Sequence, residues 1–234
     1  MSDSGPNTTD RRGFVGAVAA LSAGLALRAD DPVQRLFVAQ QPSDDWLDHL
    51  KGKHRQLFDV PEPEGGTALR HLRNYLDAWR NAFGVGERDV SVVVTLYART
   101  TPLGLQDAMW GKYQLGAALS LTDPTTNAPL VRNWFAHPTP GDPVADGEPD
   151  TSMEALQKRG VVFALCNNAL TRWAGRLAKS GPGGAGGAGG AGGAAAVDVH
   201  ADLVAHALPG VVIVPDVLVT MTKAHERGFA YVRS

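Results

Sequence analysis

Short apolar runs alternate with amphipathic segments from residue 54 to residue 234, and this alternation narrows the possible folds more than any other feature. The runs are rich in β-branched and aromatic residues and are bounded by Gly, Pro or charged residues, as buried strands are. The pattern predicts strands at 54–60, 90–97, 161–165, 211–214 and 229–232. Because helical segments separate these strands, we expect a parallel sheet joined by right-handed crossovers.

The clearest helix is expected between Gly66 and Gly84, because its apolar residues recur every three or four positions. These residues are Leu69, Leu72, Leu76, Trp79 and Phe83. Further helices are predicted at 46–50, 105–118, 198–207 and 216–227, and another directly after residue 166. Thr151 and Glu154 have the spacing of a capping box, which predicts a short helix ending at Gly160.

The first 29 residues have the order of parts found in a bacterial export signal. A polar start leads to Arg11 and Arg12, and an Ala- and Gly-rich apolar stretch follows at 16–27. The segment resembles a twin-arginine (Tat) signal, with Val15 where the pattern usually has Leu. We therefore expect the Tat translocase to recognise Arg11 and Arg12 and to export the protein to the periplasm or cell envelope. The alternative is a cytosolic protein with a disordered tail and a short helix.

With 234 residues, of which 44% are hydrophobic, the chain is long enough for one α/β domain, expected at 30–234. A net charge of −2 without a basic stripe predicts no nucleic-acid partner. No apolar stretch after residue 30 is long enough to span a bilayer. Residues 120–150 predict a long loop, and the Gly/Ala repeat at 180–197 predicts a flexible insertion.

Cys166 is the single cysteine of the chain and follows the apolar run 161–165. At the end of a parallel strand, a thiol meets the backbone N–H groups and the positive dipole end of the next helix, both of which favour the thiolate. One cysteine cannot form a disulfide within the chain. The alternative interpretation is that Cys166 is a small buried hydrophobic residue.

Three segments together resemble the DsrE-like family of small α/β proteins associated with sulfur transfer. They are Arg159–Leu170, which contains Cys166, Leu208–Pro215, and Ala224–Val232. The resemblance implies a three-layer, flavodoxin-like parallel sheet of about five strands with helices on both faces, often assembled into homo-oligomers. It also implies that Cys166 accepts sulfur as a persulfide, with a sulfur donor or acceptor protein or a small thiol as partner and without a cofactor.

Other residues are expected beside this thiol. Asn167 and Asn168 begin the next helix and offer amide donors, while Arg99 and Thr100 follow the strand at 90–97 and belong to the same sheet edge. A cysteine hydrolase of the isochorismatase type is disfavoured, because Asp59 ends the first strand but no Lys stands at a matching strand end.

Two further interpretations concern metal binding and a non-catalytic role. A metal site is not expected, because the ligand-type residues Asp198, His200, Asp202 and His206 fall on an amphipathic helix, where a solvated face is the simpler explanation. The remaining hypothesis is an exported binding or assembly protein in which Cys166 belongs to the core. In that case Trp134, Phe135 and His137, in the loop at 120–150, contact a partner or ligand.

Overall fold

The computed structural model describes residues 45–140, 142, 148–180 and 195–234. The chain divides into two units, Met1–Gln41 and Pro42–Ser234, and all of the described residues belong to the second. The predicted export signal at 1–29 and most of the predicted Gly/Ala insertion lie outside the described residues.

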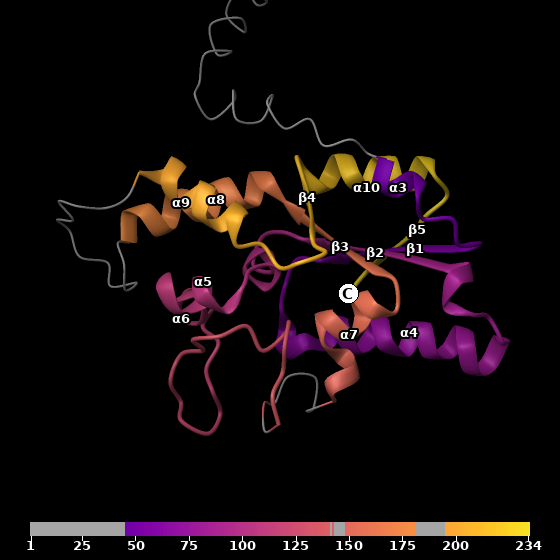
Figure 1. The fold of residues 1–234 in the computed structure, drawn as a ribbon, viewed down its shortest axis with the longest axis horizontal. Helices are drawn as coiled ribbons and strands as arrows, with labels where there is room; N and C mark the ends of the chain where they lie inside the picture. Colours follow the sequence, from indigo (N-terminus) through magenta and orange to yellow (C-terminus); the bar gives the residue numbers. More distant parts are fainter. Residues whose placement is uncertain (1–44, 141, 143–147, 181–194) are drawn as a thin grey trace, which may run out of the picture. The chain divides into compact units, whose positions relative to one another are not determined.

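A five-stranded parallel sheet forms the centre of the second unit (Figure 1). Its strands are β1 (His54–Val60), β2 (Val90–Leu96), β3 (Val161–Cys166), β4 (Val212–Val214) and β5 (Ala230–Arg233). All neighbouring strands pair in parallel, in the order β4-β3-β2-β1-β5. The predicted strands are therefore confirmed, with ends that differ by at most one residue. The order differs from the 2-1-3-4-5 order of flavodoxin itself.

Helices cover both faces of this sheet, which gives a three-layer, flavodoxin-like α/β fold. In Figure 1, α4 (Thr67–Phe83) and α7 (Met153–Lys158) lie on one side of the sheet, and α3 (Asp45–Asp48) and α10 (Val217–Glu226) lie on the other. Beyond the carboxyl ends of the strands lie α5 (Asp107–Lys112), α6 (Leu115–Leu119), α8 (Asn167–Ser180) and α9 (Ala196–Ala205). Short 3-10 turns complete the described elements at η1 (Glu64–Gly66), η2 (Glu87–Asp89), η3 (Thr101–Gly104) and η5 (Pro149–Thr151).

The alternation of side chains along the strands divides the apolar interior into two clusters. Val92 and Val94 of β2 belong to the larger cluster with α4 and α7, whereas Val93 belongs to the smaller cluster with α3 and α10. All seven residues of β2 are buried, because β1 and β3 flank the strand and helices cover both of its faces.

The predicted ends of two helices, α4 and α7, can be compared with the structure. The predicted stop of α4 is confirmed, since Gly84 adopts a left-handed conformation with φ of 66° and caps the helix. At α7 the predicted capping box is wrong by one residue. Ser152, not Thr151, is the N-cap, and its hydroxyl accepts a hydrogen bond from the backbone N–H of Ala155.

The single helix predicted at 105–118 is wrong. The segment follows η3 and forms two short α-helices, α5 and α6, and Gln114 has a left-handed φ of 49° between them. Contacts with distant residues explain the break. The backbone N–H of Gln106 donates to the carbonyl of His206, and Gly116 lies directly against the backbone of Leu130. These contacts override the local helix periodicity.

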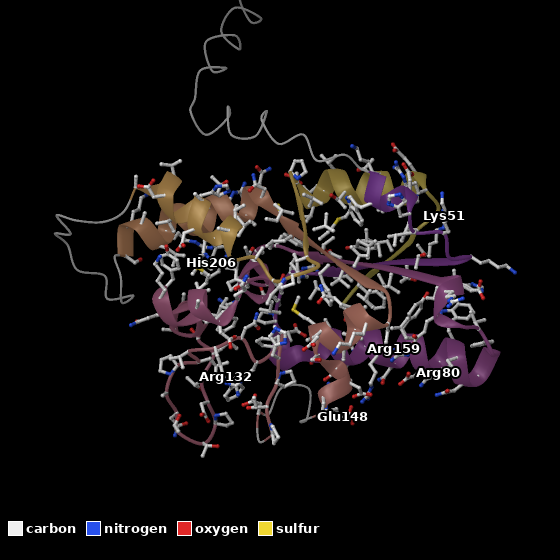
Figure 2. All side chains as sticks on the ribbon, in the orientation of Figure 1. Lys51, Arg80, Arg132, Glu148, Arg159 and His206 are labelled. Atoms are coloured by element: carbon white, nitrogen blue, oxygen red, sulfur yellow. The ribbon has the colours of Figure 1, made fainter. Side chains whose placement is uncertain are left out.

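Ion pairs also connect the end of α7 to α4 and to η2, on the same side of the sheet. Arg159, labelled in Figure 2, follows the end of α7. It donates to Asp77 of α4 at 2.8 Å and to Glu87 of η2 at 2.6 Å. Its side chain is only 15% exposed, so these ion pairs are better shielded from water than ordinary surface pairs.

Candidate functional site

The connections after β3 and β4 diverge at the carboxyl edge of the sheet. Leu170, Trp173 and Leu177 of α8, which follows β3, join the larger cluster, whereas the apolar residues of α10, which follows β4, join the smaller one. In α/β sheets, ligands commonly bind where the helices of two neighbouring strands depart in different directions. A ligand site is therefore expected at the carboxyl ends of β3 and β4.

Cys166 is the last residue of β3 and lies at this position, as the sequence predicted. Its pairing partner on β4 is Val214. The residue is only 4% exposed and belongs to the smaller apolar cluster, together with Ala164, Ala169 and Val214. The structure thus encloses the thiol largely in hydrocarbon.

Asn167 and Asn168 begin α8 beside Cys166, and both amide side chains have partners. Oδ1 of Asn167 lies 2.8 Å from Nε2 of His200, which comes from α9. Nδ2 of Asn168 donates to Asp216, the N-cap of α10, at 2.7 Å. The two asparagines connect the helices around the divergence point, and Asn168 ties α8 to α10.

Arg99 and Thr100 make their contacts elsewhere. Arg99 pairs with Glu62 at 2.8 Å and donates to the carbonyl of Leu119 at 2.5 Å. Thr100 is fully buried, and its hydroxyl donates to the carbonyl of Val60. The structure therefore brings Asn167 and Asn168 next to Cys166, while Arg99 and Thr100 connect the segment after β2 to α6 and to the end of β1.

A polar cluster that sequence reasoning did not predict surrounds Asp59, near the end of β1. Asp59 is 4% exposed, and the hydroxyl of Tyr231 on β5 donates to its carboxylate at 2.6 Å. Thr95 of β2 donates to the same carboxylate at 3.3 Å. A sequence signal was available, since an acidic residue in a buried strand needs hydrogen-bond partners, but nothing in the sequence identified them.

The ionisation of two tyrosines responds to this carboxylate. Burial, followed by a hydrogen bond to Asp59, raises the pKa of Tyr97 to about 12. The hydrogen bond to Asp59 is the main reason why the pKa of Tyr231 is also raised. Both phenols therefore remain protonated at neutral pH and are held as neutral donors toward Asp59.

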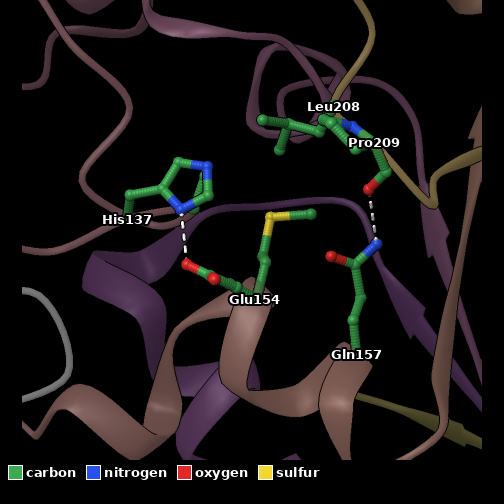
Figure 3. A pocket seen from close by; sticks show the side chains of 7 residues that line it. His137, Glu154, Gln157, Leu208 and Pro209 are labelled. Carbon is green, nitrogen blue, oxygen red and sulfur yellow. Dashed lines mark hydrogen bonds and ion pairs between the residues drawn. The ribbon is translucent and has the colours of Figure 1, made fainter.

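A separate pocket of about 190 Å³ lies on the larger-cluster side of the molecule, at the first residues of α7 (Figure 3). It is lined by Ala136, His137, Met153, Glu154, Gln157, Leu208 and Pro209. Of the three loop residues predicted to contact a ligand or partner, His137 lines this pocket, whereas Trp134 and Phe135 are 7% and 2% exposed and belong to the core.

The described residues contain no group of three or more His, Cys, Asp or Glu side chains arranged to hold a metal ion. Within the same residues, no helix has the length and apolar character needed to cross a membrane.

Comparisons with known proteins give little more than a distant structural likeness. No family model matches the chain, and no curated protein matches it. A solved structure of a protein of unknown function, MTH1491 from Methanobacterium thermoautotrophicum, aligns with 77% of this chain and 99% of its own length. The identity is 16% and the TM-score is 0.36.

Proposed function

We propose that this chain is a DsrE-like α/β protein with a non-catalytic binding or assembly role, and that Cys166 belongs to its core. The observation that carries this proposal is the enclosure of Cys166, which is 4% exposed within an apolar cluster. A reactive cysteine needs an accessible and electropositive environment, whereas a buried one behaves as a small hydrophobic residue. Burial would also protect an unpaired thiol from oxidation outside the cytoplasm.

Export through the Tat pathway, and with it a location in the periplasm or cell envelope, is part of this proposal. It rests on the order of charged, apolar and small residues at 1–29, with Arg11 and Arg12 as the contacts for the translocase. The family resemblance adds a homo-oligomeric state, which sedimentation of the purified protein measures directly.

Thiol labelling tests the core role of Cys166. We expect a chromogenic disulfide reagent to label the native full-length chain slowly and the urea-unfolded chain rapidly. The native rate should rise with urea in parallel with global unfolding, because the thiol becomes accessible only when the smaller cluster opens. Cys166→Ala provides the blank and should lose about 1 kcal/mol of unfolding free energy through the lost packing. Rapid stoichiometric labelling in the absence of urea would contradict the proposal.

A thiol-dependent role, with Cys166 as a sulfur carrier, is the second candidate. It is favoured by the position of Cys166 where the connections after β3 and β4 diverge, directly before the first turn of α8. In this reaction the Cys166 thiolate attacks the terminal sulfur of a persulfide donor. The S–S bond of the donor breaks, a new S–S bond forms at Cys166, and the donor leaves as a thiolate.

Intact-mass measurement decides this second candidate. After incubation with a small-molecule persulfide, a carrier gains the mass of one sulfur atom, and a reducing thiol removes it. Cys166→Ser is the matched control and should gain nothing. If the wild-type mass does not change, or if Cys166→Ser changes equally, the carrier role is excluded.

A further inference from the structure

The pocket at α7 is formed by three segments that hydrogen bonds hold in place. The backbone N–H of Met153 donates to the carbonyl of Phe135 at 2.9 Å, which joins α7 to the loop. Gln157 of α7 donates to the carbonyl of Pro209 at 3.0 Å. Leu208 is joined through its own backbone N–H to the carbonyl of Gly104. The walls are therefore fixed before any ligand arrives, as is typical of binding pockets.

The loop that carries His137 is itself held by buried polar contacts. Asn133 is fully buried and donates to the carbonyls of Leu103 and Leu105 at 2.7 and 2.8 Å. Arg132 donates to the carbonyl of His137 and forms an ion pair with Asp142. These contacts hold the backbone of the loop around His137.

The hydrogen bond between His137 and Glu154 leaves one imidazole nitrogen for a ligand. Nδ1 of His137 lies 2.8 Å from Oε2 of Glu154. Hydrogen bonds from Lys158 and then from His137 lower the pKa of Glu154, so its carboxylate is ionised and only accepts. In neutral His137 the proton therefore stays on Nδ1, and Nε2 is an acceptor. Figure 3 shows Nε2 on the side of the ring away from Glu154 and turned toward Leu208.

Gln157 provides a second acceptor. Its Nε2 group is bound to the carbonyl of Pro209, which fixes the orientation of the amide because a carbonyl can only accept. Its Oε1 atom therefore points away from Pro209, toward the Glu154 side of the pocket (Figure 3). Met153, Leu208, Pro209 and Ala136 supply the apolar part of the lining. The pocket thus combines hydrogen-bond acceptors with an apolar wall.

We infer that this pocket binds a small, largely apolar molecule that carries one O–H or N–H donor. A dry protein cavity of about 150 Å³ holds benzene, so a pocket of about 190 Å³ has room for a ring of that size with one substituent. The apolar lining takes the ring, and Nε2 of His137 or Oε1 of Gln157 accepts the donor hydrogen. This inference deepens the binding role proposed above and rests on it.

Phenol and toluene are the probes, because they have nearly the same size and differ in the donor. The full-length protein, labelled with ¹³C at its methionine methyl groups, is titrated with each at about pH 8.5, where histidine side chains are ordinarily neutral. We expect phenol to shift the Met153 methyl resonance and to bind about fivefold more tightly than toluene, the effect of one hydrogen bond. Met109 and Met221 do not line the pocket and serve as internal controls.

Substitutions of the two acceptors test their role. His137→Phe keeps a ring of similar size and should reduce the preference for phenol, as should Gln157→Met, while toluene still binds. His71→Phe is the matched control, because His71 lies on α4 and contacts Ser234 instead of the pocket. Circular dichroism confirms that each variant is folded, and the two acceptor variants provide independent tests.

Specific outcomes overturn the inference. It is wrong if phenol leaves the Met153 methyl unshifted, if phenol and toluene bind the wild type equally, or if neither acceptor variant changes their ratio. Thiol labelling separates this failure from failure of the proposed function. If Cys166 is protected and phenol does not bind, the core role of Cys166 stands and the pocket inference is wrong. If phenol binds and Cys166 is accessible, the pocket inference stands and the core role of Cys166 is wrong.

Discussion

Asp59 lies near the carboxyl end of β1, where the hydroxyls of Tyr231 and Thr95 donate to its carboxylate. Burial, followed by a hydrogen bond to Asp59, raises the pKa of Tyr97 to about 12. At the scale of single residues, this cluster gives the folded chain an unusual response to alkali. The unfolded chain ionises its tyrosines near their ordinary pKa of about 10, while folded Tyr97 keeps its proton up to about pH 12.

The sign of the resulting pH dependence follows from proton linkage. Below pH 10, Tyr97 is protonated in both states and its contribution to stability is fully present. Between about pH 10 and 12 the unfolded state has lost this proton and the folded state has not, so the free energy of unfolding falls as the pH rises.

Replacement of Tyr97 by Phe should therefore make the chain less sensitive to alkali. We expect the wild type to lose about 1 kcal/mol more unfolding free energy than Tyr97→Phe between about pH 9.5 and 11.5, a value reduced because solvent reaches the hydroxyl. Urea unfolding at a series of pH values measures this difference. Asp59→Asn should lower the pKa of Tyr97, followed by absorbance at 295 nm. Equal alkaline slopes in wild type and Tyr97→Phe would refute the linkage.

At the scale of elements, the contact between α6 and the loop at Leu130 breaks the predicted helix at 105–118. A Cβ atom added to Gly116 would lie 2.2 Å from the carbonyl oxygen of Leu130, closer than any side chain can approach. A Cβ atom added to Gly111 in α5 meets only the carbonyl of Val131, at 3.7 Å, which is an ordinary contact.

These two glycines form a matched pair for mutation. Gly116→Ala should lower the free energy of unfolding by about 2 kcal/mol or more, because α6 has to move away from Leu130. Gly111→Ala should raise it by about 0.5 kcal/mol, because alanine is the better helix former. Chemical denaturation measures both values. A Gly116→Ala variant as stable as the wild type would show that α6 does not pack against the loop in this way.

Sequence periodicity predicts the sheet better than it predicts the connections. Strands such as β2 have apolar residues on both faces because both faces are covered, so burial itself shapes the sequence pattern. Gln106 and Gln114 carry no comparable local signal. The backbone N–H of Gln106 donates to the carbonyl of His206, and no pattern within 105–118 predicts that contact.

At the scale of the whole molecule, the remaining prediction concerns where the protein works. If residues 1–29 form a Tat signal, changing Arg11 and Arg12 together to lysine should abolish export, because the translocase recognises the arginine pair. Fractionation of a bacterium that expresses each form measures the exported share. The change of Arg28 to Lys is the matched control and should leave export unchanged. Undiminished export of the double variant would remove the Tat assignment.

The candidate site was predictable in position but not in environment. The end of an apolar run placed Cys166 at the carboxyl edge of the sheet, and the structure confirms that position. Its enclosure depends on Val214 from β4 and on other residues of the smaller cluster. Arg99 and Thr100 were also expected beside the thiol, and the structure gives their polar partners as Glu62, the carbonyl of Leu119 and the carbonyl of Val60.

The sequence alone determined the strands, most of the helices and the parallel character of the sheet. The reason is that buried faces of strands and helices give neighbouring residues a pattern of apolar side chains that is visible in the local sequence. Tertiary structure decided which polar groups meet. Asp59 and Tyr231 stand 172 positions apart, and only the pairing of β5 beside β1 brings the hydroxyl to the carboxylate. The pocket at α7 likewise forms only where the loop, α7 and the segment before β4 converge, since no local pattern relates His137 to Gln157 or Pro209.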